Sequence, residues 1–276
     1  MKTRIISGVV GILLFAAILI FSTPIALDKY YPWILKAAVA VLAAIGVWEI
    51  LNNTKIVKNK IISVLSALCG AGLVVLFSGN YGEKALLAYF LFVAVLLTVS
   101  LFIHEKTSPA ELAASQAYTL FISFSFAAVL NLLAGYGMFA FLLVFIFAWA
   151  SDTFAYFTGV FLGKHKLCPA LSPKKTIEGA IGGIVGCMVA VAVACILNDI
   201  SLTDTTLWTL TLCTPIFSVM GMVGDISASY IKRHAGIKDY GNLMPGHGGV
   251  LDRFDSVLLI APVFYALLRF FPTIMI

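Results

Sequence analysis

Length, composition and charge restrict the class of protein before any motif is considered. The chain has 276 residues, of which 61% are hydrophobic and 11% are charged, and its net charge is +5. An average soluble domain is about 45–50% apolar and about 25% charged. So few charges could not cover the surface of a water-soluble globule, and the composition also excludes a disordered chain, a collagen and a disulfide scaffold. The class that remains is an integral membrane protein with many spans.

Apolar segments long enough to cross a membrane occupy most of the chain. A spanning helix needs about 20 mostly apolar residues, whereas barrel strands alternate over about ten residues. The apolar runs here are continuous, which favours helices. We predict an all-α polytopic protein with about nine transmembrane helices, at residues 5–22, 33–51, 61–78, 85–103, 115–134, 138–161, 178–197, 207–224 and 254–270.

The basic residues between these segments predict the orientation, because Lys and Arg concentrate in the cytoplasmic loops of membrane proteins. With a cytoplasmic N-terminus, 14 of the 18 Lys and Arg residues fall on the cytoplasmic side. The four on the other side are Lys29, Lys36, Lys84 and Arg269. Loops 162–177 and 225–253 are then cytoplasmic. Topology and anionic membrane lipids account for the net positive charge, so no nucleic-acid partner is expected.

The two halves of the chain differ in character. Residues 1–137 hold about five nearly motif-free spans, whereas residues 138–276 bring polar residues and clustered glycines into or beside the spans. Glu49 is the one unusual residue of the first half, and we expect it to be an interfacial carboxylate that faces water or headgroups. Ionisable groups within spans are costly and usually line a site. The second half is therefore the expected catalytic region.

The first polar cluster lies within the span at 138–161. Asp152, Tyr156, Gly159 and Gly163 share one face at helical spacing. That face could carry a site carboxylate with a phenol partner and two points of close helix approach. A structural Asp bonded to a neighbouring helix explains the same pattern equally well.

The second cluster is the cytoplasmic loop 171–179. Ser172 and Pro173 can open a helix, with Ser172 as the cap and Pro173 in the first turn. Lys174, Lys175 and Thr176 would then sit at a helix N-terminus, where free N–H groups and cations can bind an anion. Simple anchoring by positive charges on the cytoplasmic side is the alternative. The following glycines form G-x-x-x-G pairs that permit close helix contact.

The third cluster spans residues 224–255 and is the richest. Asp225, Asp252 and Asp255 offer hard oxygen ligands for Mg²⁺. Lys232 and Arg233 supply cations, and the glycine-rich run at 245–249 offers backbone that can approach phosphates. Acids that hold Mg²⁺ and cations that hold phosphate are the parts of a nucleotide–metal site. A salt-bridged cytoplasmic loop is the alternative. For His247 we expect a hydrogen bond to phosphate rather than a metal bond.

The segment 229–255 resembles the signature of the phosphatidate cytidylyltransferases, also called CDP-diacylglycerol synthases. That signature reads S-x-(apolar)-K-R-x4-K-D-x-G-x2-(L/I/F)-P-x-H-G-G-(apolar)-x-D-R-(apolar)-D, and the one departure is Met244 where Leu, Ile or Phe is usual. The matching fixed positions are Ser229, Lys232, Arg233, Lys238, Asp239, Gly241, Pro245, His247, Gly248, Gly249, Asp252, Arg253 and Asp255. The loop 172–179 and the segment 151–156 also resemble the family.

The resemblance implies an enzyme that converts CTP and phosphatidate to CDP-diacylglycerol and pyrophosphate with Mg²⁺. It maps the metal-binding carboxylates to Asp225 and Asp252, and Asp255 is a third candidate. Lys232 and Arg233 join these three acids as catalytic candidates. The candidate substrate-binding residues are Asp152, Ser172, Lys174, Lys175, Thr176, Ser229, Lys238, Asp239, His247, Gly248, Gly249 and Arg253. The expected location is a bacterial inner membrane, with the active site on the cytoplasmic side where CTP is found.

Two other functions are compatible with parts of this pattern. A related CTP-dependent enzyme could act on another lipid phosphate, such as an isoprenoid one. A secondary transporter would show inverted repeats and interrupted spans in both halves, whereas the polar residues here are confined to one half. The sequence does not decide the oligomeric state and leaves a homodimer open.

Overall fold

The computed structural model describes residues 17, 20, 32–79, 82–244 and 246–275. The predicted first span at 5–22, apart from residues 17 and 20, and Pro245 of the signature segment lie outside the described residues. The chain forms two compact units. The first is Met1–Ala127 with His234–Phe254, and the second is Ala128–Arg233 with Asp255–Ile276. Our division at 137/138 followed motif content and stays a prediction.

Six helices among the described residues are long and apolar enough to cross a membrane. They are Trp33–Asn53, Lys60–Phe77, Gly82–Phe102, Pro109–Leu162, Ile177–Leu197 and Thr205–His234. The predicted spans from 33–51 to 207–224 overlap these helices, and those at 115–134 and 138–161 share one of them. The last predicted span, at 254–270, corresponds to a shorter apolar helix. The protein is thus a mostly helical integral membrane protein.

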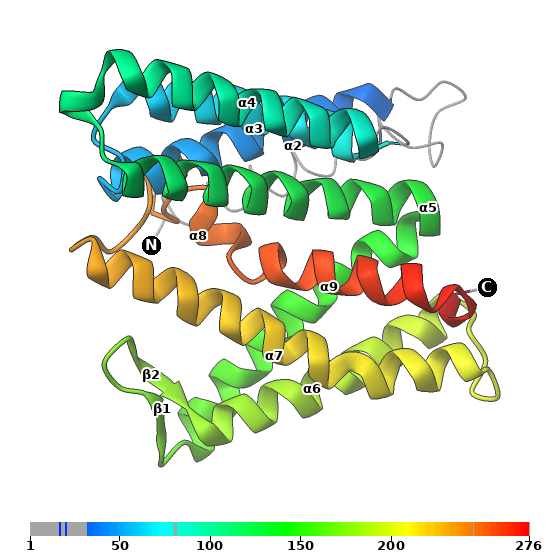
Figure 1. Cartoon of the computed structure of the whole chain (residues 1–276). Helices are drawn as coiled ribbons and strands as arrows, with labels where there is room; N and C mark the ends of the chain where they lie inside the picture. Colours follow the sequence, from blue (N-terminus) through cyan, green and yellow to red (C-terminus); the bar gives the residue numbers. More distant parts are fainter. Residues whose placement is uncertain (1–16, 18–19, 21–31, 80–81, 245, 276) are drawn as a thin grey trace. The chain divides into compact units, whose positions relative to one another are not determined.

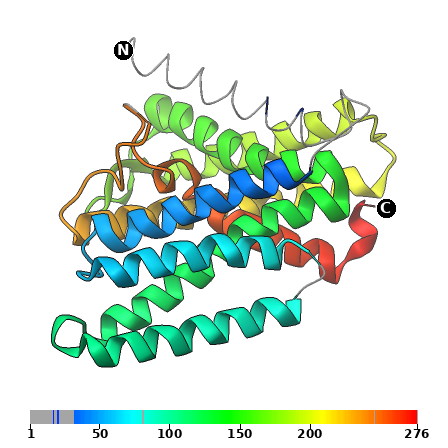
Figure 2. The ribbon, with the colours of Figure 1, turned by 90° about the horizontal axis from the view of Figure 1, so that it is seen from above.

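The first unit is built around three helices that lie side by side in Figures 1 and 2, namely α2 (Pro32–Trp48), α3 (Lys60–Phe77) and α4 (Gly82–Phe102). A π-helical turn, η1 (Glu49–Asn53), continues α2. Asn59 caps α3 by accepting a hydrogen bond from the Ile61 N–H at 2.9 Å. The unit also contains η2 (His104–Lys106), the start of α5 (Pro109–Leu162) and the short helix α8 (Leu251–Phe254).

The second unit contains the rest of α5, a two-stranded hairpin, α6 (Ile177–Leu197), α7 (Thr205–His234), α9 (Val257–Phe270) and η3 (Pro272–Met275). Helix α5 is interrupted at Gly137, whose φ of 82° favours glycine. Three fully buried rings from α5, α7 and α9 form its aromatic core: the Phe147 centroid lies 4.4 Å from that of Phe217 and 5.3 Å from that of Phe264.

The hairpin corrects two expectations about the loop that precedes α6. Strands β1 (Lys166–Cys168) and β2 (Ser172–Thr176) pair antiparallel, so the protein is not purely α-helical. Ser172 and Pro173 belong to β2 and do not open a helix. The helix starts at Ile177 instead, because the Thr176 hydroxyl accepts the Gly179 N–H at 3.0 Å and supplies the cap.

Close packing of α5 against α6 confirms the role expected of the G-x-x-x-G pairs. A Cβ atom added to Gly183 would lie 2.8 Å from the backbone oxygen of Ser151, and one added to Gly179 would lie 2.8 Å from the oxygen of Ala155. Because both neighbours are backbone atoms, a side chain at either position would force the helices apart. This packing holds the polar face of α5 beside the hairpin.

Candidate active site

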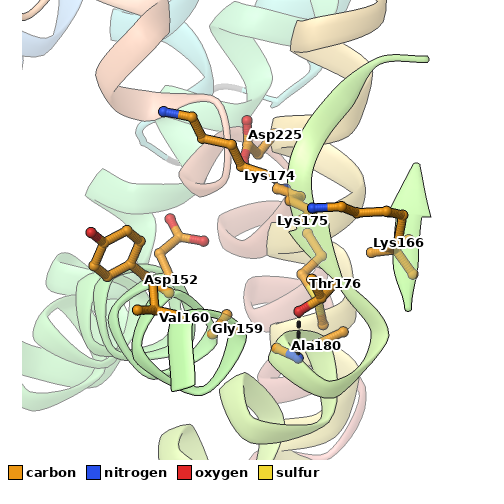
Figure 3. Close-up of a pocket in the computed structure, with 14 residues that line it drawn as sticks. Asp152, Gly159, Val160, Lys166, Lys174, Lys175, Thr176, Ala180 and Asp225 are labelled. Carbon is orange, nitrogen blue, oxygen red and sulfur yellow. Dashed lines mark hydrogen bonds and ion pairs between the residues drawn. The ribbon is translucent and has the colours of Figure 1, made fainter. Parts of the chain in front are cut away.

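A cavity of about 590 Å³ in the second unit collects polar side chains from four elements (Figure 3). Asp152 comes from α5, Lys174 and Lys175 from β2, Lys166 from β1, and Asp225 from α7. The cavity therefore gathers two carboxylates and three lysines within the second unit. This charge pattern suits a ligand that carries several negative charges together with a cation.

The closest charged contact in this cavity joins Lys175 and Asp225. Lys175 Nζ lies 2.6 Å from Asp225 Oδ2, and the two side chains are 22% and 29% exposed. The pair connects loop 162–177 with the C-terminal part of α7. These two segments therefore lie at the same end of the second unit, which agrees with the relative placement that the loop charges predict.

Asp255 lies next to this group, just outside the long apolar helices. A Cβ atom on Gly224 would lie 2.5 Å from the Asp255 backbone oxygen, so α7 approaches the backbone there. Asp255 interacts electrostatically with Asp225 and with the buried Lys232. Asp255 and Lys232 thus belong to the same electrostatic environment as Asp225.

The second unit brings together most of the residues that the sequence proposes for it. Asp152, Lys174, Lys175, Thr176 and Asp225 line the cavity, although the Thr176 hydroxyl serves as the α6 cap. Ser172 does not line it. Ser229 is half-buried on α7 and Arg233 is exposed near its end. Lys166, Tyr156 and Met222 also line the cavity, and only Tyr156 carries a sequence signal, its helical spacing from Asp152.

The first unit holds the remainder of the signature, which we call the signature loop and define as residues 238–253. Asp252 organises this loop, because its Oδ2 accepts hydrogen bonds from the Tyr240 N–H at 2.7 Å and the Gly249 N–H at 2.9 Å. The Met244 N–H donates to the Gly248 oxygen at 3.0 Å. We expected the Gly249 N–H to contact a phosphate, but it donates to Asp252 instead.

A second cavity, of about 390 Å³, opens on the signature loop. Five of the predicted substrate-binding residues line it: Lys238, Asp239, His247, Gly248 and Arg253. Gly246, which belongs to the glycine-rich run expected to approach phosphates, lines it as well, and so does Asn242, which was not predicted as a binding residue. Gly246 and Gly248 have φ angles of 79° and 84°, which explains why glycine stands at these two positions. The cavity offers cations, an imidazole and an amide to an anionic ligand.

Glu49 is not the water-facing carboxylate that we expected. Its residue is only 3% exposed, and its two carboxylate oxygens accept hydrogen bonds from the backbone of the signature loop. The expectation was wrong because an acid at the end of an apolar span normally reaches water, whereas here residues about 200 positions further along the chain cover it. The only sequence signal was the presence of an acid in an otherwise apolar segment.

The donor set of the second unit fits Mg²⁺ in chemistry. Asp152, Asp225 and Asp255 interact electrostatically with one another, and carboxylate oxygens are the ligands that Mg²⁺ prefers. Among the described residues, no three His, Cys, Asp or Glu side chains are already arranged to hold a metal. Asp225 faces Lys175 in this arrangement, so a cation there would compete with the ammonium group.

Comparison with known proteins agrees with the family that the signature motif indicates. The model of the cytidylyltransferase family matches residues 2–271. A phosphatidate cytidylyltransferase of Staphylococcus haemolyticus is 32% identical over 97% of this chain and 99% of its own length. One of Staphylococcus epidermidis is 34% identical over 97% and 99%, and one of Bacillus subtilis is 32% identical over 98% of both chains. This chain therefore belongs to the cytidylyltransferase family.

Proposed function

We propose that this protein is a phosphatidate cytidylyltransferase that converts CTP and phosphatidate to CDP-diacylglycerol and pyrophosphate. The observation that carries the proposal is the pair of polar cavities in a membrane protein of this family. One presents Lys174 and Lys175 beside Asp152 and Asp225, and the other is lined by the signature loop. Each cavity offers cationic groups to a polyanionic substrate, which needs neutralisation of its charge and a fixed orientation.

The reaction needs no covalent intermediate with the protein. A phosphatidate phosphate oxygen attacks the α-phosphorus of CTP, forming a new P–O bond. The bond from the α-phosphorus to the oxygen that bridges it to the β-phosphorus breaks, and pyrophosphate leaves with the electron pair. The attacking phosphate is already ionised at neutral pH, so a general base is not required. Lys174, Lys175, Lys232 and Arg233 would hold the phosphate groups and balance their charge.

We propose Asp225 in the second unit and Asp252 in the first unit as Mg²⁺ ligands, with Asp255 as a third candidate. Mg²⁺ would supply electrostatic stabilisation of the phosphate charge as it shifts to the leaving group. Asp252 also bonds to the signature-loop backbone, so in our proposal it fixes the loop and binds the metal. Lys175 would move from Asp225 toward a substrate phosphate when the cation binds.

We further propose nine spans, a cytoplasmic N-terminus and an active site on the cytoplasmic face of a bacterial inner membrane. The β1–β2 hairpin and the loop after α6 lie at opposite ends of that helix, so they should face opposite sides. Labelling of Ala170→Cys and Leu202→Cys variants in intact cells with a membrane-impermeant maleimide tests this. Label at residue 202 alone supports the proposal, whereas label at residue 170 alone would reverse the orientation. A homodimer is tested by light scattering of the protein in detergent.

The decisive assay combines the purified full chain in detergent with α-labelled CTP, phosphatidate and Mg²⁺. We expect labelled CDP-diacylglycerol and one pyrophosphate per product, both lost with a chelator and restored by added Mg²⁺. An isoprenoid phosphate replaces phosphatidate in a parallel arm. Product in that arm alone would overturn phosphatidate as the substrate and favour the related enzyme on another lipid phosphate.

A further inference from the structure

We propose that Glu49 and Asn53, in the π-helical turn η1, are positioning residues that hold the signature loop in its working shape. The inference rests on the proposed function for its catalytic consequence. It assigns a role to the N-terminal half of the chain, which carries no recognisable motif. All the residues involved lie in the first unit.

Glu49 binds the loop through both carboxylate oxygens. Oε1 accepts the Val250 N–H at 3.0 Å and Oε2 accepts the Leu251 N–H at 3.0 Å. Among the described residues no cation forms an ion pair with Glu49, and a buried acid without such hydrogen bonds would be costly. Glu49 therefore fixes the backbone immediately before Asp252.

Asn53 binds the other side of the loop. Its Nδ2 donates to the Tyr240 oxygen at 2.6 Å. The Tyr240 N–H donates to Asp252, so both backbone polar groups of Tyr240 have partners, one from η1 and one from the loop itself. Tyr240 is 2% exposed. Two residues of one five-residue π-turn thus hold the loop at two points that are ten residues apart in sequence, and π-turns are frequent at functional sites.

Two signature glycines provide independent support. A Cβ atom on Gly241 would lie 2.5 Å from Glu49 Oε1, and one on Gly249 would collide with both carboxylate oxygens of Glu49. Neither glycine has a positive φ, so space rather than backbone conformation accounts for glycine there. The Glu49 carboxylate occupies the space that a side chain would need at either position.

The cavity residues Lys238, His247 and Arg253 belong to the same loop. Release of Val250 and Leu251 would loosen the backbone that places Asp252 and this cavity. The hydrogen bonds of Glu49 go to Val250 and Leu251, and neither of these residues lines the cavity, so the expected effect of Glu49 on catalysis is positional. Loss of an outer partner that orients a metal-site residue typically costs about 10- to 100-fold in activity or metal affinity.

The test compares Glu49→Gln with Glu111→Gln in the full-length protein. Glu111 is a matched control, because its Oε2 also accepts a backbone N–H in the first unit, that of Lys58 at 3.2 Å, away from the signature loop. Hydrogen exchange of the loop amides is measured first, since it does not depend on any substrate. We expect exchange at Val250 and Leu251 to be about 10-fold faster in Glu49→Gln and unchanged in Glu111→Gln. Unchanged exchange in both would overturn the proposal whatever the substrate is.

Kinetics provide the second readout. For Glu49→Gln we expect kcat with CTP and phosphatidate to fall about 10- to 100-fold and the Mg²⁺ concentration for half-maximal rate to rise. The elution profile and the midpoint of thermal unfolding should match those of Glu111→Gln. Asn53→Ala should produce a smaller loss of the same kind. A wild-type kcat in Glu49→Gln would contradict a positioning role. So would a loss of activity that is fully explained by an equal fraction of unfolded protein.

A rescue experiment tests the glycine contact itself. Gly249→Ala should reduce activity, because its methyl group collides with Glu49. Glu49→Asp retracts the carboxylate by one methylene, so the double variant should recover part of the activity lost in Gly249→Ala. A double variant less active than Gly249→Ala would refute the contact as the reason for the glycine. Failure of the wild-type protein to use CTP and phosphatidate would instead refute the proposed function and leave the exchange result intact.

Discussion

Replacement of Lys175 provides the sharpest test of the cavity in the second unit. At 2.6 Å from Asp225, the Coulomb attraction is about 6 kcal/mol at an effective dielectric constant of about 20. Desolvation of the two groups offsets much of this attraction. The side chains are 22% and 29% exposed, so water screens the pair only in part. Lys175 is therefore the cation whose charge acts most strongly inside the cavity.

We expect Lys175→Gln to lower kcat by about 100-fold or more, because loss of one preorganised group that stabilises developing charge costs about 2.7–4 kcal/mol. Asp225 loses its counter-charge at the same time, so the Mg²⁺ concentration for half-maximal rate should fall. Opposite changes in turnover and in Mg²⁺ requirement distinguish this role from simple loss of structure. The assay is CTP-dependent pyrophosphate release over a Mg²⁺ titration.

Lys174→Gln is the matched control, because Lys174 lines the same cavity but is exposed. Solvent screens exposed charges, so we expect a loss below about 10-fold. Equal effects of the two substitutions would refute the argument that the charge of Lys175 acts most strongly in the cavity, and no loss in either would mean that these lysines only anchor the loop at the membrane surface. Lys175→Arg, which keeps the charge, should retain more activity than Lys175→Gln.

Two further outcomes follow from the geometry. Asp252→Asn should abolish Mg²⁺-dependent turnover in the pyrophosphate assay while the protein still elutes as a folded species, because an Asn oxygen can still accept the loop N–H groups; retained turnover would falsify the metal assignment. Gly183→Ala should lower the free energy of unfolding by about 1–3 kcal/mol, since its methyl would press on the Ser151 backbone. Gly72→Ala, with nothing within 4 Å, should leave the midpoint of thermal unfolding unchanged.

The local pattern of the sequence is sufficient to predict the helices, because a span must be apolar along its whole length and must satisfy its backbone hydrogen bonds internally. The segments at 61–78 and 178–197 match α3 and α6 within a residue or two. The start of α6 was harder to predict, since Ser172 and Thr176 are both good caps. The choice depends on whether residues 172–176 pair with β1, and pairing between strands is not a local property.

The candidate site likewise combines features that the sequence predicts with features that depend on tertiary packing. Charge and spacing were enough to select Asp152, Lys175 and Asp225, since ionisable residues in such an apolar chain are conspicuous. Their meeting in one cavity depends on how α5, α6 and α7 pack. Nothing in the sequence around residue 49 indicates that its carboxylate binds the backbone at residues 250 and 251.

The sequence by itself determined the class of protein, the family motif and the type of chemistry, because all three depend on which residues are present and on their spacing. The tertiary structure decided which partner each charged group has. It placed Lys175 against Asp225 and the Glu49 carboxylate against Val250 and Leu251. The physical reason is that a polar or charged group removed from water needs a hydrogen-bond or ion-pair partner. In this bundle of helices the partner of each of these groups lies far away in the sequence.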